Sequence, residues 1–142
     1  MPTAVEMILR LEGIAGQSAD HNGSIEVLSF SFGVAQAERG TNGGAGKSTI
    51  GDLVVVKALD KASPSLFLAC AKGTRLTKGE FVILPAVQDG VAGRGDVALY
   101  RFSDVIVESV RQMGNEHAGT PTEEVTLEFG RLESFTVGDG SV

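Results

Sequence analysis

The run Gly44-Ala45-Gly46-Lys47-Ser48 has the residue types that bind phosphate. A P-loop needs a glycine, four residues and then Gly-Lys-Ser/Thr, so that backbone amides surround the phosphates. Here the leading glycine would fall at Thr41, and Gly40 is one place too early. A P-loop also opens a helix, whereas residues 50–57 have the pattern of a strand. We therefore interpret the run as a flexible loop entering a strand, with nucleotide binding as the minor alternative.

Other reactive side chains lack the spacing of a catalytic site. His21 and His117 lie in polar stretches without a ligand-spaced partner, and we interpret both as exposed loop histidines. Glu123 and Glu124 are adjacent, which in a strand places them on opposite faces and not on one substrate. The single cysteine, Cys70, excludes an intrachain disulfide framework and a multi-cysteine zinc site. We expect no catalytic residue, no cofactor, no metal site and no enzymatic activity.

Composition limits the classes of partner. The 142 residues carry 12 basic and 18 acidic side chains, a net charge of −6, which would repel a nucleic acid. The longest uncharged stretch has eleven residues, 27–37, whereas a membrane-spanning helix needs about 20. The N-terminal residues 1–6 lack the basic and apolar regions of a signal peptide. We therefore expect that the chain does not span a membrane and that it is synthesised in the cytoplasm.

Alternation of apolar and polar residues predicts that strands dominate. The clearest alternating sets are Met7, Leu9 and Leu11; Leu28, Phe30, Phe32 and Val34; and Val125, Leu127 and Phe129. Residues 53–56 and 81–84 are short apolar runs typical of strands covered on both sides. The run 97–110 reads as a long strand bent near Ser103-Asp104. A change of parity between Phe129 and Leu132 predicts a β-bulge near Gly130-Arg131.

One segment has helical signals. Ser63 is a candidate N-cap, Pro64 suits the first turn, and Gly73 suits a left-handed C-cap, which predicts a helix over about Pro64 to Lys72. Leu66, Phe67 and Cys70 would form its apolar stripe. No linker or repeat divides the chain, so we expect a single domain over 1–142, with a short flexible tail after about residue 137.

Several blocks together resemble one protein family. They are Ile25 to Val34, Gly44 to Lys47, Asp60 to Pro64 followed by Ala69-Cys70 and Gly73, and Glu124 to Phe129. In order and spacing they resemble the haemolysin-coregulated proteins (Hcp), the tube subunits of bacterial type VI secretion systems. Many members carry tryptophan where this chain has Phe30 and Phe32.

The resemblance implies a compact β-barrel of two antiparallel sheets with the helix packed alongside. Six copies would form a ring, and rings would stack into a hollow tube inside a contractile sheath. The tube, tipped by a spike protein, would be expelled with effector proteins in its lumen. The protein would then leave the cell through this machine without a cleaved signal peptide.

Two regions are candidate functional sites. Ser29 and Ser31 form the small face of the strand Ile25 to Ala35, opposite Leu28, Phe30, Phe32 and Val34, which we expect to point into the barrel. The two serines would face the lumen and its cargo, or else pack against a neighbour. The glycine-rich loop is the suspected ring-stacking contact, with an ordinary surface loop as the alternative; its candidate residues are Arg39, Asn42, Gly43, Gly44 and Lys47.

Other functions stay open at this stage. One is the tail-tube protein of a related contractile injection device, and another is a monomeric β-barrel that binds a small ligand. A third is a nucleotide-dependent enzyme that uses the Lys47 loop.

Overall fold

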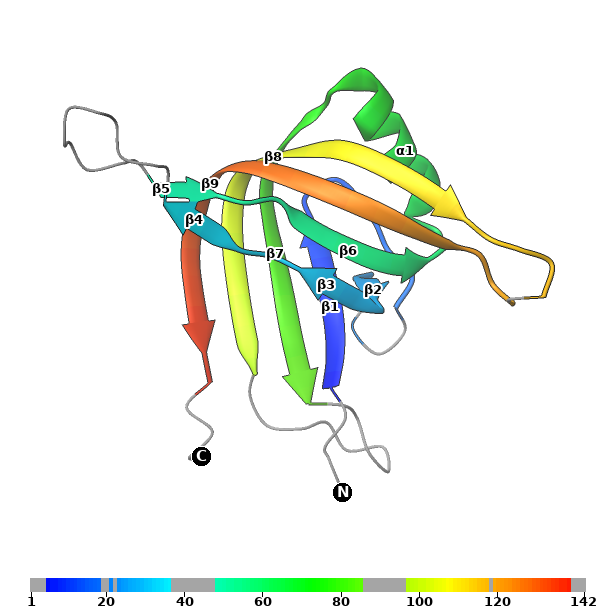
Figure 1. Ribbon diagram of the computed structural model, residues 1–142, viewed down its shortest axis with the longest axis horizontal. Coiled ribbons are helices and arrows are strands. Elements are labelled where there is room, and N and C mark those ends of the chain that lie inside the picture. The colour runs from blue at the N-terminus through cyan, green and yellow to red at the C-terminus, as the bar shows by residue number, and fades with distance from the viewer. Residues whose placement is uncertain are drawn as a thin grey trace.

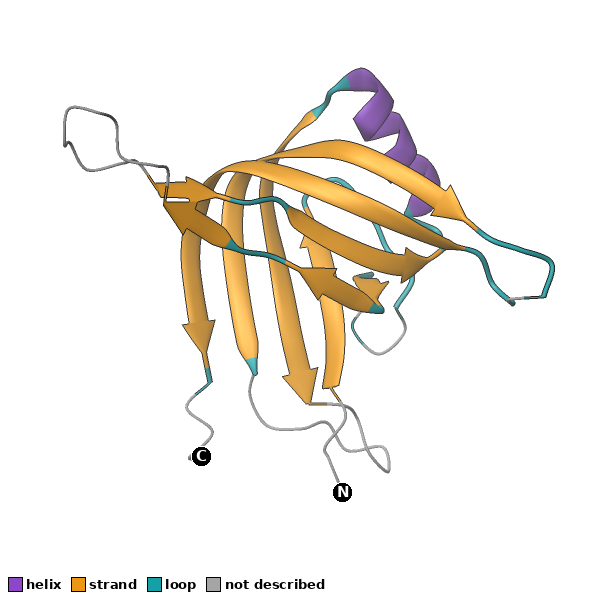
Figure 2. Cartoon of the chain, viewed as in Figure 1, coloured by secondary structure: helices purple, strands orange, loops and turns teal. Residues whose placement is uncertain are grey.

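The computed structural model describes residues 5–18, 21, 23–36, 48–85, 97–117 and 119–138. Most of this part of the chain is strand (Figures 1 and 2). The strands are β1 (Val5–Leu11), β2 (Ile25–Val27), β3 (Ser29–Ser31), β4 (Val34–Gln36), β5 (Ser48–Ile50), β6 (Leu53–Ala58), β7 (Arg75–Pro85), β8 (Ala98–Met113) and β9 (Thr122–Val137). The helix is α1 (Ser63–Lys72), as the sequence predicted to within a residue.

Seven strands form one antiparallel sheet that curls into a nearly closed barrel. Their order is β2-β1-β7-β8-β9-β6-β3, while β4 and β5 form a separate two-stranded ribbon. The two ends of this order, β2 and β3, are separated in the chain by Leu28 alone, so the chain itself joins the two edges of the sheet. The predicted antiparallel barrel with one helix is confirmed (Figure 1).

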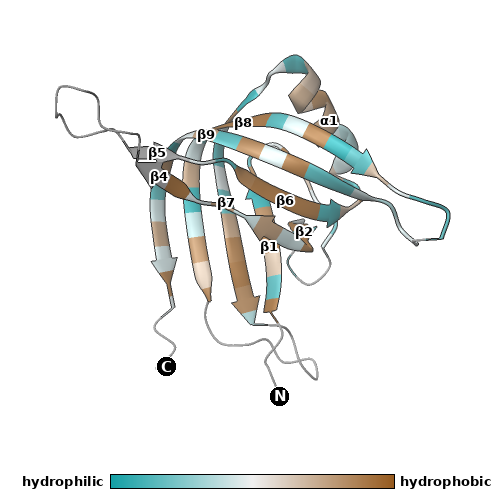
Figure 3. Cartoon of the chain, in the orientation of Figure 1, coloured by the Kyte–Doolittle hydropathy of each residue, from teal (hydrophilic) through white to brown (hydrophobic). Residues whose placement is uncertain are grey.

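The core lies between the curled halves of the sheet. Its fully buried members come from strands throughout the chain and from α1, and include Leu9, Ile25, Val55, Leu66, Phe81, Val105, Val125 and Leu127. Polar and apolar residues alternate along the first half of β9, from Glu124 to Phe129, which gives the banding of that strand in Figure 3. Phe30 and Phe32 close the core with ring contacts to Phe81 (centroids 4.8 Å apart) and Phe129 (5.5 Å). The predicted inward set Val125, Leu127 and Phe129 is confirmed.

The predicted single strand Ile25 to Ala35 is wrong. The segment divides at a bend at Leu28, because β2 pairs with β1 whereas β3 pairs with β6. Ile25 and Val27 face the core before the bend, and Phe30 and Phe32 do so after it. Leu28 is 59% exposed, and Val34 in the β4–β5 ribbon is also exposed, so these two do not point into the barrel.

The long strands β8 and β9 bend sharply. Asp104 adopts a left-handed φ of 61°, which confirms the predicted bend near Ser103-Asp104. The β8–β9 register shifts twice, leaving Glu108 of β8 and Glu133 of β9 without a register partner. The predicted bulge near Gly130-Arg131 is therefore misplaced: the extra residue of β9 is Glu133.

Helix α1 packs on β8 and ends as predicted. Gly73 has φ 65° and ψ 33°, and its N–H donates to the carbonyl of Cys70 at 3.2 Å. The N-cap is Ala62 and not Ser63, because the Ser63 hydroxyl bonds to groups of the barrel (described below). The predicted apolar stripe is also rotated, since Leu66 and Ala69 are buried but Phe67 is exposed. No helix in the described part of the chain has the length and apolarity needed to cross a membrane.

Candidate functional site

The two predicted serines lie on strand β3 and point to solvent. Ser29 and Ser31 are both exposed, while Phe30 between them packs into the core. Their register partners in β6 are Val56 and Val54, which continue the same face. This surface, which we call the serine face, runs on through β9 and β8 by register pairing and comprises Ser29, Ser31, Val54, Val56, Thr126 and Ser109. These residues carry hydroxyl and small aliphatic side chains, and the row that begins with Ser29 and Val56 continues to the charged residues Glu124 and Arg111.

An acidic cluster lies at one end of these strands. Asp52 precedes β6, Glu108 lies at the β8 bulge, and Glu128 lies in β9. The negative charge of Asp52 raises the pKa of Glu108 above its usual range; partial desolvation, a hydrogen bond with Asp52 and the charge of Glu128 act in the same direction. Any group that binds there meets concentrated negative charge.

The predicted ring-stacking residues Arg39, Asn42, Gly43, Gly44 and Lys47 lie outside the described residues. The strands that flank them are described: β4 ends at Gln36, β5 begins at Ser48, and the two pair antiparallel. The segment after Lys47 is therefore a strand, so the helix that a P-loop opens does not follow it.

The second half of β9 has an open edge. Strand β6 covers β9 only from Thr122 to Leu127, so residues 128–137 pair with β8 on one side and with no described strand on the other. Two large apolar side chains there reach solvent, Phe135 (52% exposed) and Val137 (63%). Phe135 stacks on Tyr100 of β8 with ring centroids 4.5 Å apart, which fixes its position. Unpaired backbone groups beside fixed apolar side chains favour pairing with another chain.

A buried polar cluster, which the sequence analysis missed, joins the helix to the barrel. Lys57 donates hydrogen bonds to Glu123 and to Ser63 Oγ (3.2 Å), and forms an ion pair with Asp60 Oδ1 (2.9 Å). Ser63 Oγ also donates to Glu123 Oε2 at 2.5 Å, and Gln112 Nε2 to Glu123 Oε1 at 3.2 Å. Burial raises the pKa of Glu123, but these hydrogen bonds from Lys57, Ser63 and Gln112 outweigh it and hold that pKa below its ordinary value.

A signal for this cluster exists in the sequence. In β6, Lys57 continues the alternating series Leu53 and Val55, whose side chains face the core. In β9, Glu123 lies two residues before Val125, which also faces the core. A charged residue at the core parity of each of two strands predicts a buried pair. Because Lys57 and Glu123 are fully enclosed, we assign the cluster to stability and not to binding.

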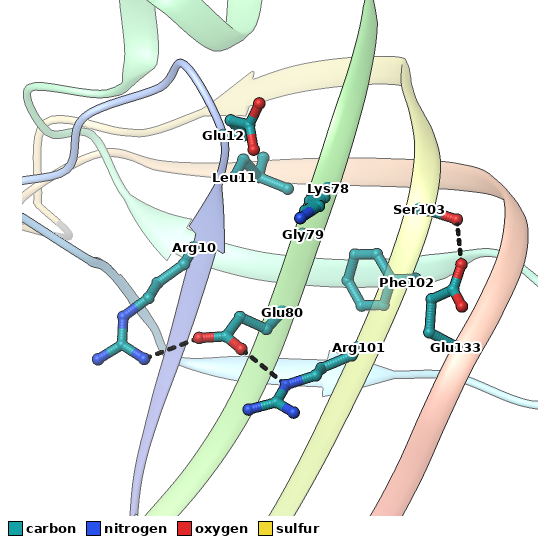
Figure 4. A pocket seen from close by; sticks show the side chains of 10 residues that line it. All are labelled: Arg10, Leu11, Glu12, Lys78, Gly79, Glu80, Arg101, Phe102, Ser103 and Glu133. Carbon is teal, nitrogen blue, oxygen red and sulfur yellow. Dashed lines mark hydrogen bonds and ion pairs between the residues drawn. The ribbon is translucent and has the colours of Figure 1, made fainter.

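A large hollow lies on the outer face of the sheet, across β1, β7, β8 and Glu133 of β9 (Figure 4). It measures about 790 Å³. Glu80 stands at its centre and accepts from Arg10 (3.0 Å) and Arg101 (3.2 Å). Ser103 donates to Glu133 at 2.7 Å on the opposite wall. The hollow combines several charged side chains from neighbouring strands, which suits the binding of a charged partner.

The remaining reactive groups do not converge on a site. His21 is mostly buried and not exposed as predicted, because its Nε2 lies 2.8 Å from Glu6 Oε1. His117 is exposed, as predicted, and pairs only with its neighbour Glu116. Cys70 is a half-buried free thiol that donates to the carbonyl of Glu108 at 3.6 Å. Across the described segments, no group of three or more His, Cys, Asp or Glu side chains could hold a metal ion.

Similarity to known proteins gives these surfaces a context. Residues 8–134 match the family "Type VI secretion system effector, Hcp". The chain is 32% identical to Protein hcp1 of Pseudomonas aeruginosa over 135 residues, 92% of this chain and 82% of that protein. The crystal structure of Hcp1 from Salmonella typhimurium is 29% identical, with a TM-score of 0.75 over 89% of this chain and 82% of that one. A type VI secretion system effector from Yersinia pestis is 28% identical, with a TM-score of 0.67 over 87% and 83%.

The family match, residues 8–134, includes α1, the serine face and residues 128–134 of the open edge, but not Phe135 and Val137. The match begins within β1 and ends within β9, so it spans nearly the whole described barrel. On this ground, the chain belongs to the Hcp family of type VI secretion proteins.

Proposed function

We propose that this chain is a structural subunit of the type VI secretion tube and that six copies assemble head to tail into a ring. Family membership supports the role in type VI secretion. The observation that carries ring assembly is the open edge of β9 from residue 128 to 137. A closed ring needs a contact between two different surfaces of the subunit, and a strand edge on one side supplies one of them.

The edge has a physical reason to be covered. Each unpaired backbone N–H and C=O can bond to a neighbouring strand, which also removes the exposed apolar side chains from water. Phe135 and Val137 are the side chains concerned. Burying a side chain of this size contributes about 1.5–3 kcal/mol, so the pair can stabilise a subunit contact appreciably.

In the same proposal, rings stack into a hollow tube that a contractile sheath expels with a spike protein at its tip. The loop with Arg39, Asn42, Gly43, Gly44 and Lys47 makes the ring-to-ring contact. Ser29 and Ser31 face the lumen, where the hydroxyl-rich serine face offers adaptable hydrogen bonds to effector proteins. The protein is made in the cytoplasm and secreted, as the expelled tube, by the type VI machine without a cleaved signal peptide.

Native mass spectrometry of the purified chain tests the ring. The expected species has six times the 14.8 kDa mass of one chain. Val137→Lys places a charge on the open edge and should reduce the hexamer to smaller species. Leu68→Lys is the matched control, because Leu68 is similarly exposed but lies on α1. A wild-type chain that stays at 14.8 kDa would instead favour the monomeric ligand-binding barrel.

Two further variants test the tube and its cargo. Shortening the loop 37–47 should leave single rings folded and abolish tubes in electron micrographs. Ser31→Gln should leave the native mass unchanged and weaken retention of a co-expressed effector. If Ser31→Gln breaks the rings, the serine face is a packing surface. Titration with Mg-ATP tests the nucleotide alternative, which requires binding that Lys47→Ala abolishes.

A further inference from the structure

Three hollows follow one another along the outer face of β7 and β8, which points away from the core. The hollow of about 790 Å³ lies in the middle. One of about 140 Å³ shares Arg10, Glu80 and Arg101 with it, and one of about 360 Å³ shares Ser103. We call this continuous surface the outer groove.

Charged side chains form the walls of the outer groove. Arg10, Glu80 and Arg101 are register neighbours on β1, β7 and β8, and they form a row across the sheet. Gly79 lies beside this row in β7 and lines the groove through its backbone, because its side-chain position faces Phe102 and Leu11 in the core. At one end the lining becomes apolar, with Ile8, Val82, Leu84 and Leu99.

Glu80 holds the two arginines in place. It accepts from Arg10 Nη1 and from Arg101 Nε, and Arg10 Nε donates in addition to Ser24 Oγ at 2.9 Å. The two guanidinium groups nevertheless remain open to solvent, with 48% and 60% of their side chains exposed. Figure 4 shows both converging on Glu80 from opposite sides. Fixed arginines lose little conformational freedom when a ligand arrives, which favours binding.

The hydrogen-bonding groups of the outer groove differ in whether they already have a partner. Two of its carboxylates are engaged, since Glu80 bridges two arginines and Glu133 accepts from Ser103. By contrast, the Nη atoms of Arg101 and the Nζ of Lys78 have no hydrogen-bond partner within the described chain. Glu12, the third carboxylate of the lining, is exposed and also has no side-chain partner within the described chain, so the free groups are one carboxylate and the donors of Arg101 and Lys78. These donors can bind a carboxylate with charge-assisted hydrogen bonds.

We propose that the outer groove binds a segment of a partner protein that carries carboxylate and apolar side chains. The carboxylates pair with Arg101 and Lys78, and the apolar side chains lie against Leu84 and Leu99, which are partly exposed. The chain's net charge of −6 opposes an acidic partner at long range, so the contact depends on these fixed donors at short range. The groove lies on the face of the sheet, whereas the open edge of β9 lies in its plane, so pairing at that edge leaves the groove accessible.

Fluorescence anisotropy with a labelled peptide of four Glu-Leu repeats tests the proposal on the full-length protein. Arg101→Gln and Lys78→Gln should each weaken binding about tenfold, because each removes a charge-assisted hydrogen bond. Arg111→Gln and Lys72→Gln are matched controls, since both residues are exposed and lie outside the groove. They should change the affinity less than about twofold, a change that corresponds to under 0.5 kcal/mol.

Several outcomes would overturn the proposal. One is equal binding of the peptide by the groove variants and the controls, and another is equally tight binding of a Lys-Leu peptide. Native masses of the same samples are read in parallel, so a failure of ring assembly is seen separately from a failure of peptide binding. If Arg101→Gln changes the native mass but not peptide binding, the groove is a contact between copies and the proposal is wrong.

Discussion

Lys57 of β6 and Glu123 of β9 lie 66 residues apart in the chain, are register partners, and form an ion pair with both side chains fully buried. Removing two charges from water costs several kcal/mol per ion, and their attraction offsets this only with further hydrogen bonds. Ser63 and Asp60, at the start of α1, supply such bonds. The pair therefore holds both the β6–β9 ladder and the helix.

Breaking this pair should be strongly destabilising. Either Lys57→Met or Glu123→Leu leaves the opposite charge buried without its partner and should lower the free energy of unfolding by about 3–5 kcal/mol. The double variant removes both charges and should recover much of that loss. Urea unfolding of the wild type, the two single variants and the double variant measures the coupling energy between Lys57 and Glu123. Additive effects of the two substitutions would contradict a stabilising ion pair.

The same pair predicts an acid-sensitive fold. Hydrogen bonds hold the pKa of Glu123 below its ordinary value of 4.5, so the ionised carboxylate stabilises the folded state. This contribution is present above about pH 4.5 and is lost as the pH falls through the lowered pKa. Unfolding midpoints between pH 7 and pH 3 should fall more steeply for the wild type than for the Lys57→Met/Glu123→Leu double variant. Equal slopes would show that other carboxylates cause the acid sensitivity.

Phe30 and Leu28 should respond differently to truncation. Phe30 contacts the rings of Phe81 and Tyr100, with centroids 4.8 and 6.4 Å away, but remains partly exposed. Phe30→Ala should therefore cost about 2–3 kcal/mol, less than the about 3–5 kcal/mol of a fully buried phenylalanine. Leu28→Ala removes an exposed side chain and should cost less than about 0.5 kcal/mol. Chemical denaturation measures both, and a similar loss for the two would mean that Leu28 is covered.

Gly79 should not tolerate a side chain. A Cβ atom there would lie 2.7 Å from Phe102 Cε2 and 2.9 Å from Leu11 Cδ2, both core residues. Gly79→Ala should lower the free energy of unfolding by about 1–3 kcal/mol through overpacking. Gly33→Ala is the control, because its Cβ would meet nothing within 4 Å. Chemical denaturation of the two variants and the wild type measures the difference in the free energy of unfolding. An unchanged value for Gly79→Ala would show that the core adjusts to the added methyl group.

Local patterns were sufficient to predict most elements. The alternation from Val125 to Phe129 gives the buried face of β9, and Pro64 with Gly73 gives both ends of α1. Such signals depend only on residues that are close in the sequence, so they can be recognised without knowing which strands pair. The family resemblance, which residues 8–134 bear out, added the closed arrangement of the strands.

Features that depend on strand partners were not predicted. The alternation from Leu28 to Val34 looks continuous, yet the chain changes partner at Leu28, so the expected inward positions fail at Leu28 and Val34. Ser63 looked like a helix cap because its role in binding Glu123 depends on a strand 60 residues away. The outer groove likewise arises from β1, β7 and β8 together and has no local signature.

The place of β9 in the sheet also has a consequence for synthesis. It lies between β8 and β6, which precede it in the chain and have no ladder with each other. While the ribosome is still making residues 122–137, the nascent chain therefore exposes two complementary strand edges at once. The barrel can close only after β9 is released from the exit tunnel, and until then β6 and β8 are the edges that a chaperone has to protect.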